Sequence, residues 1–420
     1  MTETATSATY REVLAQPVYR VVFTVRSLAI AASTLRIVAL SVLIFAGTGS
    51  AVLAATAFGI GFIPQLIGGM VLGALPDLIP PRPLIVTGYV LECGGAAALG
   101  LIELPVWASL GIVAVLACLT PVFQGSSSRL IAEVLTGDAY VLGRSLFSLA
   151  SAGAQLVGMA GAGVAVATVG PRHALLACAA SHLVAAVISR LRLPGDPNWG
   201  WSLPRSAGAG EGPKTGNRTV VRRSWRGNRR MLADPEVRAL LLAQWLPPAF
   251  VTAAEGLLVP YAAVHRYPAG AAGWALACVP VGMIVGDLVV ARLLQPDTRE
   301  RLVVPLIAVL GLPLTGFAFG VGPVPAAALL FVSGCGFAYG LGLQRRFIEV
   351  VPDEVRGQAF ALMSTGLMTL QGIGPVVFGG LAELMPIGPS IAVAGLANIG
   401  IAVGLTARLT RQSFGPITHS

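Results

Sequence analysis

The chain alternates long apolar segments with short polar connections, and one basic stretch near the middle interrupts this alternation. An apolar segment of about 20 residues is long enough to cross a bilayer as a helix. Lipid offers no partner for free backbone groups, so such spans must be helical. The predicted spans lie near 20–45, 51–75, 83–101, 105–128, 144–168 and 173–190, and then near 239–264, 270–292, 303–321, 323–345, 358–383 and 387–407. The sequence therefore predicts an all-α integral membrane protein with 12 transmembrane helices.

Composition excludes most soluble classes of protein. Of the 420 residues, 55% are hydrophobic and 11% are charged, whereas soluble domains carry about 25% charged residues. Charge is too scarce for a soluble enzyme, a disordered chain or a nucleic-acid-binding protein. The five cysteines lie within apolar runs and form no C-x-x-C pattern, so neither a metal site nor a disulfide framework is expected. We also expect no cofactor.

The distribution of positive charge predicts the orientation of the helices. Of the 28 Lys and Arg residues, 24 fall on one side of the predicted spans and two on the other. Cytoplasmic loops carry such an excess. We therefore expect a multi-pass protein of the bacterial cytoplasmic membrane, with both termini in the cytoplasm. The first span is expected to act as an uncleaved insertion signal. The predicted organisation is a cytoplasmic N-terminus (1–19), a six-helix bundle (20–190), a basic cytoplasmic linker (191–238), a second six-helix bundle (239–407) and a cytoplasmic tail (408–420).

Two short echoes relate the halves of the chain. The sequence GMVLG at 69–73 matches GMIVG at 282–286, an offset of 213, and QLVG at 155–158 matches QGIG at 371–374, an offset of 216. Both offsets imply an even number of spans per repeat, so the halves insert in the same orientation. Two parallel six-helix pseudo-repeats are a transporter architecture. The alternative is chance similarity in a chain rich in glycine and alanine.

The loop after the second span points to a known family. Residues 73–82 read GALPDLIPPR, which resembles the G-x-L-A-D-R-x-G-R-R loop of the major facilitator superfamily. The inner loops at 128–145 and 351–357 and the glycines at 158–163 are similar to the drug-exporter branch. The resemblance implies the major facilitator fold and transport by alternating access. It also implies an inner-loop latch formed by Gly73, Asp77, Arg82, Arg129 and Arg356, although the last two arginines are equally explained as positive-inside charges.

Four ionisable residues at membrane depth are candidates for coupling or gating, because such residues are costly and usually functional. Arg36 and Glu255 lie at similar depths on the first helix of each half, and we hypothesise that they pair to close an outer gate. The alternatives are separate partners or solvated side chains near the outer surface. Glu92 and Asp287 are candidates for proton coupling, although Asp287 is also placed to pair with Arg292.

Five further side chains could line a substrate cavity, although each is also explained as a packing or interface residue. They are Gln155, Trp245, Tyr261, Tyr339 and Gln371. The four histidines are scattered and no hydrolase motif occurs, so a membrane enzyme is disfavoured, as is a non-transporting sensor.

The predicted function is secondary active transport. The predicted cargo is a small amphipathic compound exported against protons, as in drug-resistance efflux by an antiporter. Uptake of a small metabolite is the alternative. The expected partners are the substrate, protons and the lipid bilayer, with no nucleic acid, and the chain is expected to be a monomer.

Overall fold

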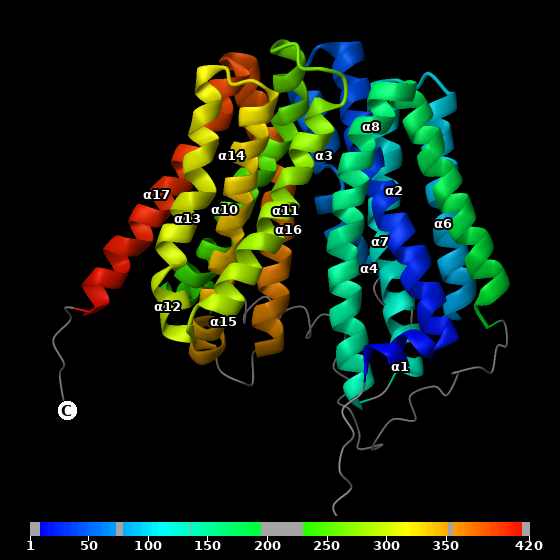
Figure 1. Cartoon of the computed structure of the whole chain (residues 1–420), viewed down its shortest axis with the longest axis horizontal. Coiled ribbons are helices and arrows are strands. Elements are labelled where there is room, and N and C mark those ends of the chain that lie inside the picture. The colour runs from blue at the N-terminus through cyan, green and yellow to red at the C-terminus, as the bar shows by residue number, and fades with distance from the viewer. Residues whose placement is uncertain are drawn as a thin grey trace, which may run out of the picture. The chain divides into compact units, whose positions relative to one another are not determined.

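The computed structural model describes residues 9–72, 79–135, 137–194, 229, 231–351 and 356–413, and every regular element within these ranges is helical (Figure 1). In chain order the elements are α1 (Tyr10–Ala15), α2 (Pro17–Thr48), α3 (Ala51–Gly59), α4 (Phe62–Leu72), α6 (Pro81–Leu101), α7 (Val106–Val134), α8 (Gly137–Arg192), α10 (Pro235–Val264), α11 (Ala271–Leu293), α12 (Pro296–Arg301), α13 (Val303–Gly311), η1 (Leu312–Phe319), α14 (Pro323–Cys335), η2 (Gly336–Ala338), α15 (Tyr339–Val350), α16 (Arg356–Leu384) and α17 (Ile387–Ser413). Most of the predicted linker at 191–238 lies outside the described residues.

Ten helical segments in the described part of the chain are long and apolar enough to cross a membrane. One of them, Leu149–Arg192, covers the two spans predicted at 144–168 and 173–190. An eleventh apolar segment, Val303–Phe319, is shorter. Each of the 12 predicted spans therefore has a helical counterpart within the described residues.

Helix α8 is divided at Gly170, which has φ 80° and ψ 166°. Only glycine adopts such a conformation without strain. Pro171 follows at once, and proline is well suited to the first position of a new helix. The long element is therefore two spans joined by a sharp turn, as the sequence predicts.

The segment formed by α13 and η1 is short in residues and still long enough to span the bilayer. It joins nine α-helical residues to eight in 3₁₀ conformation. At a rise of about 1.5 Å per α-helical residue and about 2.0 Å per 3₁₀ residue, it extends about 30 Å. This length matches the hydrocarbon core of a bilayer. Pro313, at the start of η1, lacks the N–H that would continue the α-helical pattern.

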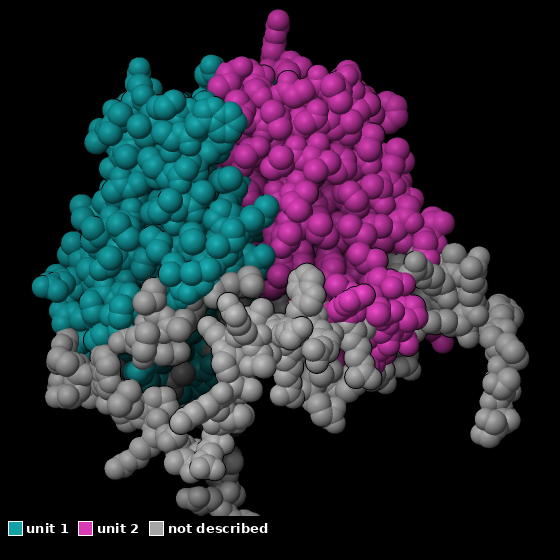
Figure 2. Space-filling model, turned by 180° about the vertical axis from the view of Figure 1, so that it is seen from behind, with its two compact units in different colours: residues 1–47, 60–207 teal, residues 48–59, 208–420 magenta. Residues whose placement is uncertain are grey.

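The chain divides into two compact units (Figure 2). Unit 1 comprises residues 1–47 and 60–207, and unit 2 comprises residues 48–59 and 208–420. The second predicted span is thereby shared, because α3 is grouped with unit 2 and α4 with unit 1. The break falls at Ile60 and Gly61, just ahead of Pro64 in the first turn of α4. The sequence analysis missed this break.

Glycines let the helices of each unit approach very closely. In unit 1, a methyl group on Gly158 of α8 would lie 2.5 Å from the carbonyl oxygen of Ala31 on α2. In unit 2, a methyl group on Gly374 of α16 would lie 2.6 Å from the carbonyl oxygen of Ala249 on α10. Real atoms cannot come so close, so only glycine fits at either crossing. The second sequence echo thus corresponds to the same kind of contact in both units.

The first sequence match, between 69–73 and 282–286, also lies at close helix crossings. In α4, however, the glycine at the crossing is not the matched one. A methyl group on Gly68 of α4 would lie 1.6 Å from the carbonyl oxygen of Cys118 on α7, whereas Gly69 has only ordinary van der Waals neighbours. On α11, methyl groups on Gly282 and Gly286 would lie 2.1 Å and 2.4 Å from carbonyl oxygens of α14. The rotation of α4 therefore places Gly68 at the crossing, one residue before the glycine that the sequence match selects.

Candidate functional site

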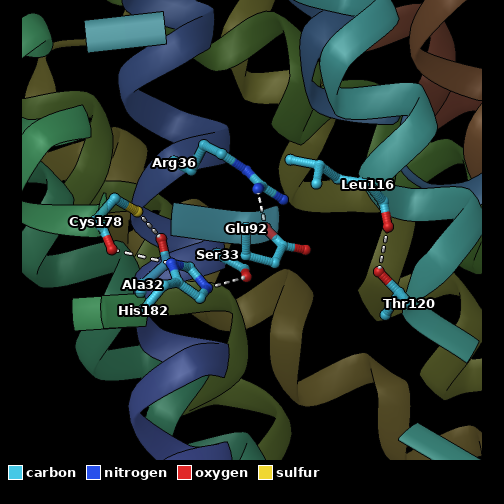
Figure 3. Close-up of polar contacts among 8 residues, drawn as sticks. All are labelled: Ala32, Ser33, Arg36, Glu92, Leu116, Thr120, Cys178 and His182. Atoms are coloured by element: carbon cyan, nitrogen blue, oxygen red, sulfur yellow. Dashed lines mark hydrogen bonds and ion pairs between the residues drawn. The ribbon is translucent and has the colours of Figure 1, made fainter. Parts of the chain in front are cut away.

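Arg36 and Glu92 form an ion pair inside unit 1 (Figure 3). Arg36 lies on α2 and donates from Nη1 to Oε2 of Glu92 on α6. The two side chains are only 8% and 10% exposed. Burying either charge alone would cost several kcal/mol, so each side chain makes the burial of the other tolerable. The Nε atom of Arg36 is buried and has no hydrogen-bond partner among the described residues.

The partner of Arg36 differs from the one that we hypothesised. The sequence analysis considered a pair between Arg36 and Glu255, whereas the structure pairs Arg36 with Glu92 within unit 1. The depths of charged residues along their helices can be read from the sequence. The rotation of α2, which directs Arg36 toward α6, cannot.

Further side chains from α2, α6 and α8 surround the pair. His182 of α8 is fully buried and lies with Nδ1 2.9 Å from the carbonyl oxygen of Cys178 and Nε2 3.5 Å from the hydroxyl oxygen of Ser33. The ring of Tyr89 lies 6.5 Å from the ring of His182. The thiol of Cys178 donates to the carbonyl oxygen of Ala32. We call Ser33, Arg36, Tyr89, Glu92, Cys178 and His182 the unit 1 polar cluster.

Sequence reasoning missed much of this cluster. It expected neither a metal site nor a disulfide from the cysteines, and it described the histidines as scattered. The available signal was spacing, because Ser33 precedes Arg36 by three residues and Cys178 precedes His182 by four. Such spacings place two side chains on one helix face. Nothing in the sequence shows that these faces meet.

Glu255 of α10 is the accessible residue in a buried stretch of unit 2. Its side chain is half-buried, whereas all other residues of 251–262 are buried. Within the part of the chain that the structure describes, Glu255 has neither an ion pair nor a hydrogen bond to its side chain. Beside it on α10, Thr252 accepts a hydrogen bond from Gln371 of α16 at 3.4 Å. A polar contact between α10 and α16 therefore lies one helical turn from Glu255.

The three aromatic residues that were predicted to line a cavity, Trp245, Tyr261 and Tyr339, are buried between helices of unit 2. The Trp245 indole donates to the carbonyl oxygen of Met363 at 2.8 Å. Tyr261 is fully buried and donates to the carbonyl oxygens of Phe317 and Val321 at 3.4 Å and 3.3 Å. Tyr339 is also buried. These three side chains take part in helix packing.

Asp287 and Gln155 are exposed. The expected pair between Asp287 and Arg292 is absent from the ion pairs of the described residues. In the predicted latch, Arg82 donates to the carbonyl oxygen of Arg190, and Arg129 lies 2.9 Å from Glu133. Gly73, Asp77 and the side chain of Arg356 lie outside what the structure describes.

The sequence profile of the Major Facilitator Superfamily matches residues 22–375. The protein belongs to this superfamily. It is accordingly a multi-pass membrane transporter, built from two six-helix pseudo-repeats. No curated protein matches the sequence.

Solved structures of other transporters share the fold. A nucleoside transporter, NupG, is 13% identical with a TM-score of 0.70, and the match covers 93% of this chain and 98% of that one. A peptide transporter, POT, is 15% identical with a TM-score of 0.70 and covers 94% of both chains. A third structure is titled as a POT family transporter in complex with a thioalcohol-conjugated peptide, and it is 11% identical with a TM-score of 0.69, covering 94% of this chain and 96% of that one. At these identities the likeness shows the fold alone.

Proposed function

We propose that this protein is a proton-coupled secondary transporter of a small organic solute, and that Glu255 carries the coupled proton. The supporting observation is a half-buried carboxylate at membrane depth that has no counter-charge among the described residues. An ionised carboxylate is costly in apolar surroundings, and protonation removes that cost. When water reaches the group, ionisation becomes favourable again. Alternating between these environments would move one proton per cycle.

The Arg36–Glu92 pair has a different role in this proposal. Its charges compensate each other in a buried position, so Glu92 already has a counter-charge. Glu255 lacks such a partner within the described residues and is more accessible. We therefore assign proton carriage to Glu255, and we assign to the Arg36–Glu92 pair the task of holding α2 against α6 in a defined arrangement.

Two cargo classes fit a transporter with this coupling. The sequence analysis favoured export of an amphipathic compound in exchange for protons. The structurally similar proteins are a nucleoside transporter and a peptide transporter, so the second class is uptake of a small metabolite of that kind together with a proton. The transport experiment below distinguishes export from uptake by the direction in which protons move.

Transport by the purified full chain in liposomes tests the coupling. Uridine, dialanine and the amphipathic cation tetraphenylphosphonium serve as probes, and a trapped pH dye reports proton movement. We expect movement of one probe to carry protons across the membrane. Protons should move in the same direction as the solute for uptake and in the opposite direction for export. Solute movement that ignores an imposed pH gradient would overturn proton coupling. Failure of all three probes to move would overturn the cargo classes given above.

Replacing the carboxylate identifies the proton carrier. Glu255→Gln keeps the shape of the side chain and cannot release a proton at neutral pH. We expect this variant to exchange labelled solute across the membrane at near-normal rates while losing accumulation driven by a pH gradient. Glu103→Gln is the matched control, because it neutralises an exposed carboxylate. Gradient-driven accumulation at the wild-type level in Glu255→Gln would remove Glu255 from this role.

A further inference from the structure

His182 is a member of the unit 1 polar cluster with a site that can accept a proton. Its Nδ1 atom lies 2.9 Å from the carbonyl oxygen of Cys178. A carbonyl oxygen can only accept, so Nδ1 must carry a hydrogen. In the neutral ring the other nitrogen, Nε2, is then a bare acceptor. Nε2 faces the hydroxyl of Ser33 at 3.5 Å.

The hydroxyl of Ser33 can serve both states of the ring. A serine hydroxyl holds one donor and two acceptor sites, and its hydrogen rotates. It donates to the bare Nε2 of the neutral ring. When a proton from bulk solvent reaches Nε2, the hydroxyl can turn and accept from the new N–H. The hydrogen bond between Ser33 and His182 therefore only reverses its direction, and no helix needs to move.

A proton on His182 would alter the charge balance around the ion pair. Arg36 and Glu92 together carry no net charge, and both are about nine-tenths buried. Ser33 lies one helical turn before Arg36, and in the view of Figure 3 it stands between His182 and the pair. An added positive charge would compete with Arg36 for the carboxylate of Glu92, because like charges repel strongly where water is scarce.

The groups that face His182 from the surrounding helices limit the possible partners. From α2 they are Ser33 and Arg36, and from α6 they are Tyr89 and Glu92. On α8 itself the neighbour is Cys178, whose thiol is engaged with the carbonyl oxygen of Ala32. Glu92 is thus the only negative charge among these groups.

We propose that His182 is a positioning residue for the Arg36–Glu92 pair, and that a proton on its Nε2 atom loosens the hold of Arg36 on Glu92. The ion pair would then be firm when His182 is neutral and labile when it is charged. Because the pair joins α2 to α6, the contact between these helices would depend on pH. The proposal rests on the proposed function only for its effect on transport.

Direct observation of the imidazole tests the proposal without a substrate. The full chain, labelled with ¹⁵N-histidine in lipid nanodiscs, contains four histidines, and His182→Asn assigns the signal of His182. We expect a neutral ring with the hydrogen on Nδ1 at high pH, and a doubly protonated ring at the acidic end of the pH range in which the chain stays folded. The transition should move to lower pH in Glu92→Gln, which removes the negative charge. A ring that stays neutral throughout, or a transition identical in Glu92→Gln, would overturn the proposal.

Milder variants keep the test valid if loss of Glu92 prevents folding. Ser33→Ala removes the acceptor for the charged ring, and we expect it also to move the transition to lower pH. Ser181→Ala, next to His182 but bonded to its own helix, should leave the transition unchanged. An unchanged transition in Ser33→Ala, or an equal shift in Ser181→Ala, would count against the proposed contact.

The effect on transport separates this proposal from the proposed function. His182→Gln retains an amide that can donate to the Cys178 carbonyl but cannot be charged. We expect it to lose one step of the pH profile of transport, a dependence of up to about tenfold per pH unit. His173→Gln is the matched control, because His173 makes the same contact on α8 at 2.8 Å and is exposed. An unchanged profile in His182→Gln, in a chain that does couple solute to protons, would overturn the role of His182 alone. Absence of coupling in the wild type would overturn the proposed function instead.

Discussion

Glu383, at the end of α16, accepts a hydrogen bond from the hydroxyl of Ser50 at 2.7 Å, although the two residues are 333 positions apart in the chain. The same carboxylate oxygen accepts from the backbone N–H of Val52 at 3.2 Å. Ser50 immediately precedes α3, so a carboxylate from one helix satisfies the free N–H groups at the start of another. Negative charge is favourable at that end of a helix. This contact joins α3 to α16 inside unit 2.

Removing the Glu383 carboxylate should loosen α3. Glu383→Ala leaves the Val52 N–H without its partner, and we expect a loss of about 1 kcal/mol, as for other helix caps. Glu383→Gln keeps a neutral acceptor and should lose less. The melting temperature of the purified chain measures both effects. Glu103→Ala is the control, and equal melting temperatures for Glu383→Ala and this control would contradict the capping role.

Breaking the buried ion pair should be far more damaging than removing it whole. We expect Arg36→Met or Glu92→Met alone to cost about 3–5 kcal/mol, because each leaves an uncompensated buried charge. The double variant leaves no charge and should recover most of that loss. Thermal unfolding of the three variants in one detergent gives the comparison. The exposed pair Arg172–Glu103, at 2.9 Å, should show less than about 1 kcal/mol in the same cycle. A double variant no more stable than the singles would disagree with mutual compensation.

Glycines at helix crossings should differ sharply from other glycines on the same helix. Gly158→Ala would drive a methyl group into the Ala31 carbonyl, and overpacking costs about 1–3 kcal/mol or more. A methyl group on Gly153 of the same helix would meet nothing within 4 Å, so Gly153→Ala should be neutral or stabilising by up to about 1 kcal/mol. Folded yield and melting temperature measure both.

The same contrast should hold in unit 2. Gly374→Ala would meet the Ala249 carbonyl, whereas Gly380 on α16 has open space around it. We expect poor folding for the first variant and normal folding for Gly380→Ala. Equal tolerance at Gly374 and Gly380 would mean that the helices of unit 2 adjust their crossing more readily than the close contact implies.

Two carboxylates of unit 2, Asp287 and Glu255, should respond differently to neutralisation. Asp287 is exposed on α11 and Glu255 is half-buried on α10. Because the proposed proton carrier is Glu255, Asp287→Asn should retain gradient-driven accumulation, unlike Glu255→Gln. Accumulation in liposomes under an imposed pH gradient distinguishes them. Loss of accumulation in Asp287→Asn with retention in Glu255→Gln would reverse the assignment.

The sequence predicted the helices well because membrane spans are set by length and hydropathy, which are local properties. It also located the break at Gly170, where glycine and proline adjoin. It missed the break between α3 and α4. There Gly59 lies against α16, where an added methyl group would lie 3.0 Å from the carbonyl oxygen of Gly372 and 3.1 Å from Pro375. That contact depends on a residue more than 300 positions away, so no local pattern indicates it.

The candidate site could be predicted only in part. Charged residues in apolar spans are conspicuous, so the sequence alone singles out Arg36, Glu92 and Glu255 as residues at membrane depth. Their partners depend on the rotation of each helix about its axis, which hydropathy does not fix when a span is apolar all round. His182 was overlooked for the same reason, because its importance comes from Ser33 on another helix.

The bond between the Trp245 indole and the Met363 carbonyl has a spectroscopic consequence. Trp245 is 9% exposed, and its ring lies against Gly366 of α16. Trp107 and Trp274 are 74% and 38% exposed, so lipid or water already surrounds them in part. Any displacement of α16 along α10 would change the polarity around this indole, the one buried indole among the tryptophans that the structure describes. The molecule thus contains an intrinsic fluorophore positioned to report that displacement during turnover, without an attached dye.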